Sequence, residues 1–391
     1  MIKPNNLIKM AAFAGASALV AGSAVAGDDC KAVVCDKAPV VEKPWTICNL
    51  FDNSTLYEND SNPFLQELAL IGRYQGQWYS SDSNHGSDTD WENRRWRAGI
   101  KAKFLHDFEF DGQFNLKTDF HSDSRFIEDV EEVSIKWEAT KDFYVQVGKF
   151  KPKVTNEWST SSRNILTFER SLLVEQVRPE KLGGVAVGGK VGDFSYDLGI
   201  FEGAVDDDWT LPDFNGGISV LAKVGYKVTE NTKVGFDYFY ADQDKESLAS
   251  GGVEEYQNVF SLNSTSQFGK FGLITDLIFA TGTDDKHHSD AFGVVIMPTY
   301  EITEKLQAVF RYQYASADSS EGLRLRSRYE RPTVNDGYST YGDGYNAFYL
   351  GANYRICKDK LKLMAGVEYS TMSGPADYSG WTYMTGIRMY Y

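Results

Sequence analysis

The chain ends in WTYMTGIRMYY, residues 381–391, in which successive side chains alternate between two sets. One set is Trp381, Tyr383, Thr385, Ile387, Met389 and Tyr391, and the other is Thr382, Met384, Gly386, Arg388 and Tyr390. Because successive side chains of a β-strand point to opposite faces, the first set forms one continuous aromatic and apolar face. About ten alternating residues are what a tilted strand needs to cross a bilayer, with lipid on one face and polar groups on the other. The C-terminus therefore predicts a membrane-spanning β-strand.

The same alternation recurs along the chain in segments of similar length, and we count sixteen of them. An even number allows a single chain to close an antiparallel barrel with both termini on one side. The segments cover residues 68–79, 94–105, 109–120, 128–138, 142–150, 182–191, 193–202, 217–227, 232–242, 256–266, 270–280, 291–301, 306–316, 345–356, 361–370 and 381–391.

The connections between these segments alternate in length, which supports the same fold. Tight turns such as EATKD, KVTEN and CKDK alternate with longer joins at 80–93, 151–181, 203–216, 241–256 and 317–345. Short periplasmic turns and long outer loops are typical of transmembrane barrels, whereas a secreted β-sandwich has no reason to alternate in this way. We predict an all-β fold, a 16-stranded antiparallel transmembrane β-barrel, which is wide enough to leave an aqueous lumen for small hydrophilic solutes.

The N-terminus predicts export. Residues 1–26 have a basic start at Lys3 and Lys9, a run of small apolar residues and AVA before Gly27, which indicates a signal peptide. We expect a periplasmic extension at 27–66 and the barrel at 67–391, in the outer membrane of a Gram-negative-type bacterium. Beyond residue 26 no apolar run reaches 18 residues, while 14% of the chain is aromatic. A formal net charge of −15 argues against a nucleic-acid partner.

The connection at 151–181 interrupts the alternation with a polar, partly amphipathic segment. Its six cations, Lys151, Lys153, Arg163, Arg170, Arg178 and Lys181, outnumber its four acids, Glu157, Glu169, Glu175 and Glu180. A loop of this kind that folds into a wide lumen narrows it, and its charges set the field there. We expect an inward-folded third outer loop, with constriction residues Lys151, Lys153, Arg163, Glu169, Arg170 and Arg178. The alternative is a loop that lies over the mouth, with its charges paired to one another or to lipopolysaccharide.

The stretch VGKFKPK, followed by TSSRNILTFERSLL and the glycine-rich GGVAVGGKVGDFSYDLGIFEG, resembles the phosphate-selective porin O and P family. The matching residues are Gly148 to Pro152, Thr160 to Ser162 and Phe168 to Leu172, and the resemblance is specific across about 145–205. Tyr391 departs from the terminal Phe of that family. The resemblance implies a 16-stranded porin, commonly trimeric, whose third loop folds into the lumen.

A basic column in the second strand bears on ion preference. Arg95, Arg97, Lys101 and Lys103 share one face, and basic residues on the lipid face would be costly, so we expect them to point into the lumen. They could form an anion path, with arginine suited to bidentate phosphate contacts. Acidic residues on the same faces leave a second reading open, a ladder of ion pairs across the wall. The segment GLRLRSRYER could funnel anions, clamp another loop or bind lipopolysaccharide.

Four cysteines in an exported chain predict disulfides. Cys30 and Cys35 are close in sequence, while Cys48 and Cys357 are both expected on the periplasmic side. Of the three possible pairings, Cys30–Cys35 with Cys48–Cys357 is the most economical. No Cys-x2-Cys motif or neighbouring histidine favours a metal, and no cofactor is expected.

Two other functions remain open at this stage. A barrel enzyme would need a nucleophile and a histidine together, but the five histidines show no Ser-x-His arrangement. No residue excludes a structural or adhesive barrel without a conducting pore. We therefore expect a non-enzymatic porin, which conducts small solutes or ions and preferentially passes anions or phosphate if the basic column lines the path. Its expected partners are membrane lipid, lipopolysaccharide and two further copies of the chain.

Overall fold

The structure is a computed structural model that describes residues 45–52, 54–117, 126–203, 214, 217–242, 256–282 and 287–391. The predicted signal peptide, Cys30 and Cys35 lie outside these residues. None of the helices in the described part of the chain is both long and apolar enough to cross a membrane.

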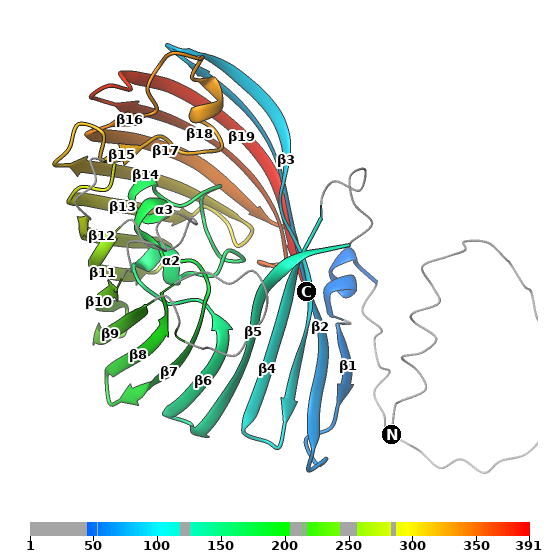
Figure 1. Ribbon diagram of the computed structural model, residues 1–391. Coiled ribbons are helices and arrows are strands. Elements are labelled where there is room, and N and C mark those ends of the chain that lie inside the picture. The colour runs from blue at the N-terminus through cyan, green and yellow to red at the C-terminus, as the bar shows by residue number, and fades with distance from the viewer. Residues whose placement is uncertain are drawn as a thin grey trace, which may run out of the picture.

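Sixteen antiparallel strands form a closed barrel (Figure 1), and each overlaps one of the sixteen segments expected from the sequence, which confirms the predicted fold class. The ring closes where β19 pairs with β2, from Gly380 opposite Ser83 to Tyr390 opposite Arg73. The strands are β2 (Leu65–Ser83), β3 (Gly86–Phe104), β4 (Phe108–Leu116), β5 (Ile127–Thr140), β6 (Phe143–Phe150), β7 (Leu182–Val191), β8 (Phe194–Glu202), β9 (Ile218–Thr229), β10 (Thr232–Ala241), β11 (Tyr256–Phe268), β12 (Phe271–Gly282), β13 (Ala291–Glu301), β14 (Leu306–Ala317), β17 (Gly344–Arg355), β18 (Leu361–Met372) and β19 (Tyr378–Tyr390).

The alternation in the sequence sorts side chains between the outer and inner faces of the barrel. In β19, Trp381 and Tyr383 are about half exposed, while Thr382 and Arg388 are buried on the opposite face. In β18, Leu363 is exposed and Glu368 is buried. The outer face is therefore apolar and aromatic, as contact with lipid requires, and the polar and charged residues face the interior.

The first long join predicted from the sequence, at 80–93, is wrong. β2 and β3 each run for 19 residues and pair as far as Ser83 and Gly86, so that only a tight turn separates them. Polar cross-strand pairs hold this part of the hairpin, including Ser80 Oγ with Thr89 Oγ1 at 2.8 Å. The prediction failed because both faces of the hairpin are polar here, so the apolar alternation stops while the backbone pairing continues.

A short N-terminal segment is attached to the rim that carries the turn between β17 and β18. It consists of the 3-10 helix η2 (Ile47–Asp52) and β1 (Thr55–Glu58), which pairs with the start of β2. A disulfide joins Cys48 to Cys357 in the turn between β17 and β18, which confirms this predicted pair. Phe51 and Leu361 pack around the disulfide. We call residues 45–52 and 54–58 the strap.

Candidate functional site: a basic cavity beside the connection at 151–181

The connection between β6 and β7, residues 151–181, contains two short helices, α2 (Asn156–Ser159) and α3 (Leu172–Val177). Thr155 caps α2, because its side-chain oxygen accepts a hydrogen bond from the backbone N–H of Trp158 at 3.2 Å. The buried side chains of α3, among them Leu172, Leu173 and Val174, belong to one apolar cluster with side chains of the barrel wall. Apolar burial therefore holds this connection against the wall.

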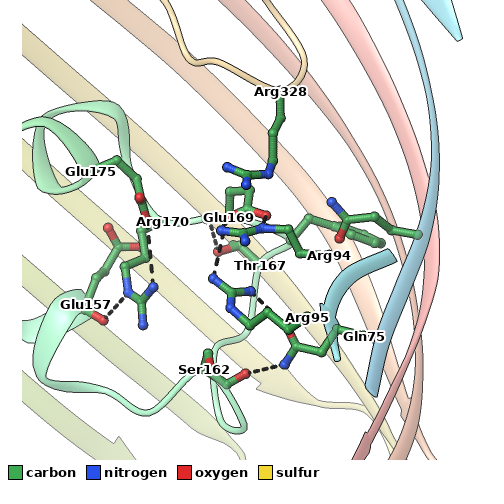
Figure 2. A network of polar contacts seen from close by, with 12 residues as sticks. Gln75, Arg94, Arg95, Glu157, Ser162, Thr167, Glu169, Arg170, Glu175 and Arg328 are labelled. Atoms are coloured by element: carbon green, nitrogen blue, oxygen red, sulfur yellow. Dashed lines mark hydrogen bonds and ion pairs between the residues drawn. The ribbon is translucent and has the colours of Figure 1, made fainter. Parts of the chain in front are cut away.

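Side chains of the wall also bind the backbone of the connection. Lys362 Nζ donates to Ile165 O at 3.0 Å, and Asn353 Nδ2 donates to Leu166 O at 3.0 Å. On another part of the ring, Gln75 Nε2 donates to Ser162 O at 2.8 Å (Figure 2). These donors lie on β18, β17 and β2, on the buried face of each strand, and Figure 1 shows α2 and α3 on the inner side of the barrel.

One buried arginine gathers several of these contacts. Arg311 on β14 is 1% exposed and pairs with Glu157 at 3.0 Å and with Glu368 at 3.0 Å. It also donates to Glu169 O at 2.8 Å and to Thr167 Oγ1 at 3.2 Å. A buried guanidinium requires such partners, so Arg311 joins the connection to the wall.

The other side of the connection borders a cavity of about 670 Å³. Twelve basic and six acidic side chains line it, so the lining has a formal net charge of +6, whereas the whole chain has a formal net charge of −15. The basic residues are Arg73, Arg94, Arg95, Arg97, Lys149, Lys151, Lys153, Arg163, Arg170, Arg178, Lys181 and Arg328, and the acidic residues are Asp111, Asp129, Glu131, Glu132, Glu175 and Glu180. The cavity therefore concentrates positive charge inside an acidic protein.

Five of the six residues expected at the constriction line this cavity, namely Lys151, Lys153, Arg163, Arg170 and Arg178. The sixth, Glu169, lies beside it and pairs with Arg94 at 2.5 Å (Figure 2). Glu169 lines a smaller cavity of about 230 Å³ between this connection and residues 324–331.

The predicted basic column divides into two pairs. Arg95 and Arg97 line the cavity, where Arg97 pairs with Glu131 at 2.7 Å. Lys101 and Lys103 lie further along β3, outside the cavity lining, and pair with Glu109 at 3.6 Å and Glu67 at 3.5 Å. All four members of the column have a carboxylate within 4.0 Å, as the ladder of ion pairs requires. An anion path along Arg95 and Arg97 stays a prediction.

Sequence reasoning missed Arg94, which alternation assigns to the outer face. A register shift between Gln75 and Gly76 pairs Arg95 with Gln75 and Asn93 with Gly76, so Arg94 is the extra residue of a β-bulge. The bulge allows Arg94 and Arg95 to approach Glu169 together. The available signal was the run RRWR, which places basic residues on both faces of one strand.

The segment GLRLRSRYER binds another loop, which is one of its expected roles: the Arg324 N–H donates to Gln176 Oε1 at 3.2 Å, and Gln176 Nε2 donates to Gly322 O at 2.7 Å. It also pairs with the barrel wall. Between β14 and β17 the chain forms β15 (Leu323–Arg324), η4 (Arg331–Thr333) and β16 (Tyr341–Gly342). Arg326 pairs with Glu330 at 2.8 Å and also with Glu368 on β18. Arg328 pairs with Glu92 on β3 at 2.7 Å and reaches the basic cavity.

Two groups of the connection have strongly shifted pKa values. Burial, together with the charges of Arg170 and Lys181, lowers the pKa of Lys151 to about 6. Burial alone raises the pKa of Glu175, but the guanidinium groups of Arg178 and Arg170 outweigh it and bring the pKa to about 2. Glu175 is therefore ionised at neutral pH, while the charge of Lys151 depends on pH near neutrality.

Comparison with known proteins supports a porin. Residues 71–250 match the model of the family phosphate-selective porin O and P, which confirms over this range the resemblance found in the sequence. Comparison with curated protein sequences gives no match.

Solved structures share the fold. The anion-selective porin from Comamonas acidovorans aligns at a TM-score of 0.59 and 11% identity, covering 83% of this chain and 99% of that chain. OmpF of Salmonella typhi, in complex with daunomycin, aligns at a TM-score of 0.59 and 12% identity, and the alignment covers 86% of this chain and 100% of that chain. The outer membrane channel DcaP of Acinetobacter baumannii aligns at a TM-score of 0.54 and 10% identity, and the alignment covers 85% of this chain and 99% of that chain.

Proposed function

We infer that this chain is a porin of the phosphate-selective porin O and P family, and we propose that it is an outer-membrane diffusion channel that prefers anions. The observation that carries the anion preference is the net positive lining of the cavity inside a strongly acidic chain. Fixed positive charge along a narrow aqueous path raises the local concentration of anions and lowers that of cations. The similarity to an anion-selective porin supports the same proposal.

The cations that matter most for such a preference are those without a carboxylate partner. Among the described residues, no carboxylate lies within 4.0 Å of Arg73, Arg163 or Lys151, although all three line the cavity. Arg73 is buried, donates to Ser162 Oγ and keeps its Nε without a hydrogen-bond partner. The charges of Arg73 and Arg163, and that of Lys151 below about pH 6, are therefore available to passing anions, including oxyanions such as phosphate.

The connection at 151–181 acts as the constriction in this proposal. Its anchors to Gln75, Arg311, Asn353 and Lys362 support this role, because they hold it against the inner face of the ring. A variant in which a short glycine–serine linker replaces 156–176 should conduct more and discriminate less between ions. Unchanged single-channel conductance in planar bilayers would reject the constriction.

Reversal potential in a KCl gradient tests the ion preference. The reversal potential of the proposed channel should have the sign expected for a channel that passes chloride better than potassium, and added phosphate should reduce the chloride current. A potential of the sign set by potassium would overturn the proposal. A barrel that shows no conductance steps would favour the structural or enzymatic alternatives.

The remaining assignments belong to the same proposal. Export by a signal peptide at 1–26, a homotrimer, and contacts with lipid and lipopolysaccharide are expected of a porin in a Gram-negative outer membrane. An OmpT structure from Vibrio cholerae is described as a trimer form, which supports the trimer. Chemical cross-linking in detergent should yield a band at three times the mass of the monomer, and a monomer alone would contradict it.

A further inference from the structure

Trp158, the third residue of α2, lies at the centre of the cations that line the cavity. Lys151 Nζ lies 4.4 Å from the centroid of its ring, and the guanidinium carbons of Arg170 and Arg178 lie 4.7 Å and 4.5 Å from it. Trp158 is 6% exposed, and it lines the cavity together with all three cations. One indole thus contacts three basic groups from separate parts of the connection.

Like charges held this close repel one another, so something must stabilise the cluster. Carboxylates offset part of this repulsion, because Glu175 and Glu180 pair with the two arginines. The face of an aromatic ring also attracts cations through its quadrupole, but it carries no net charge and so subtracts nothing from the positive field. Trp158 therefore helps to gather these cations beside the cavity without adding a negative charge.

Lys151 depends on Trp158 for both of its contacts. Its Nζ donates to Trp158 O at 3.1 Å and lies over the ring, and no carboxylate lies within 4.0 Å among the described residues. In the part of the chain that the structure describes, Trp158 therefore makes both contacts that orient this amine.

The backbone on either side of Trp158 positions Arg170. Its Nε donates to Glu157 O at 2.8 Å, and its Nη2 donates to Thr160 O at 3.0 Å. These bonds place the guanidinium over the ring of Trp158 (Arg170 is shown in Figure 2). Arg178 reaches the same ring and shares Glu175 with Arg170, at 2.9 Å and 3.6 Å. It also pairs with Glu180 at 2.6 Å.

We propose that Trp158 is a positioning residue for the ion preference of the channel, because its ring holds the basic groups of Lys151, Arg170 and Arg178 at the cavity and adds no negative charge of its own. This inference rests on the proposed function, since it requires the cavity to lie on the permeation path. It goes beyond that function because it assigns the selectivity to an uncharged residue.

The test compares the chloride-to-potassium permeability ratio of variants from reversal potentials. Trp158→Leu should lower the ratio by about threefold, the change that one ordinary cation–π contact carries, and Trp158→Phe should retain most of the preference. Trp381→Leu is the matched control, because it makes the same substitution at a residue that is 48% exposed on the outer face of β19 and does not line the cavity. This variant should keep the permeability ratio.

A second measurement separates the quadrupole from the shape of the side chain. A trifluorinated tryptophan introduced at position 158 by nonsense suppression keeps the shape of the indole but weakens its attraction for cations. The ratio should fall with this substitution even if Trp158→Leu fails to assemble.

The possible results are distinguishable. A preference that survives both Trp158→Leu and the fluorinated side chain, or one that Trp381→Leu lowers equally, overturns this inference and leaves the proposed anion channel intact. A wild-type channel without anion preference overturns the proposed function and this inference with it.

Discussion

Replacing Arg311 by methionine should release the connection at 151–181 from the barrel wall. Three of the four contacts of this buried guanidinium go to the connection, to Glu157, Thr167 and Glu169 O, and the fourth goes to Glu368. Glu368 keeps Arg326 as a partner, but Glu157 loses its only ion pair among the described residues. Breaking a buried pair in this way costs about 3–5 kcal/mol, because one charge stays buried without compensation.

The loss should weaken the docking of the connection against the wall and not the barrel itself, because β14, which carries Arg311, keeps its backbone pairing with β13 and β17. At 1.4 kcal/mol for each tenfold change, the undocked fraction should rise by roughly a hundredfold to a few thousandfold. In planar bilayers Arg311→Met should therefore show larger or noisier single-channel conductance. The double variant Arg311→Met, Glu157→Gln should recover part of the wild-type behaviour, because it removes the uncompensated carboxylate.

Arg355→Met provides the matched control. Arg355 makes a two-point ion pair with Glu301, at 2.7 and 3.0 Å, and the contacts described for it involve no residue of the connection. This variant should keep the conductance and noise of the wild type. If Arg311→Met also conducts like the wild type, or if Arg355→Met is equally noisy, the assignment of Arg311 as an anchor is refuted.

Three further predictions concern the cavity and the strap. Since the pKa of Lys151 is lowered to about 6, its ammonium is charged below that pH, so anion preference should fall as pH rises through about 6, and Lys151→Met should remove this step in the reversal potential. Lys101→Met should leave the permeability ratio unchanged, because Lys101 pairs with Glu109 outside the cavity lining. Arg163→Met should lower the permeability ratio, because Arg163 lines the cavity. Equal effects of the two variants would contradict the cavity as the selective region. Cys48→Ser should lower the free energy of unfolding by about 2–5 kcal/mol, seen as a lower temperature for the heat-induced mobility shift in SDS gels, and a reductant should lower the wild type alone.

The strands were predictable because lipid imposes a strict requirement on one face of each. Leu363 and Tyr383, for example, are outward in the structure as the alternation indicates. Where the protein leaves the lipid, that requirement ends, and the pairing of Ser80 with Thr89 could not be read from the sequence. A bulge has the same effect on Arg94, since one inserted residue changes the face on which a side chain lies.

The cavity was predictable in composition but not in its contacts. The excess of lysine and arginine at 151–181 identified five residues of the lining. Nothing in the sequence indicates that Lys362 donates to Ile165 O, which is 197 positions away, or that Asn353 donates to Leu166 O. Such bonds depend on the path of the folded connection, because any inward polar side chain is compatible with alternation. The three cations over Trp158 were hidden for the same reason.

The strap also has a consequence for how the ring of strands closes. The disulfide turns the chain from Cys48 to Cys357 into a covalent macrocycle that contains β2–β14 and β17 but leaves β18 and β19 outside it. The two cysteine Cα atoms are 5.3 Å apart, and β1 pairs with β2 next to the point where β19 ends. In an oxidised chain whose β18–β19 hairpin is not yet in place, β17 and β2 therefore remain tethered at one rim, with a gap between them for two strands. The barrel then closes when the β18–β19 hairpin inserts between β17 and β2, which the disulfide already links. Without the disulfide, strands from opposite ends of the sequence would first have to meet by diffusion.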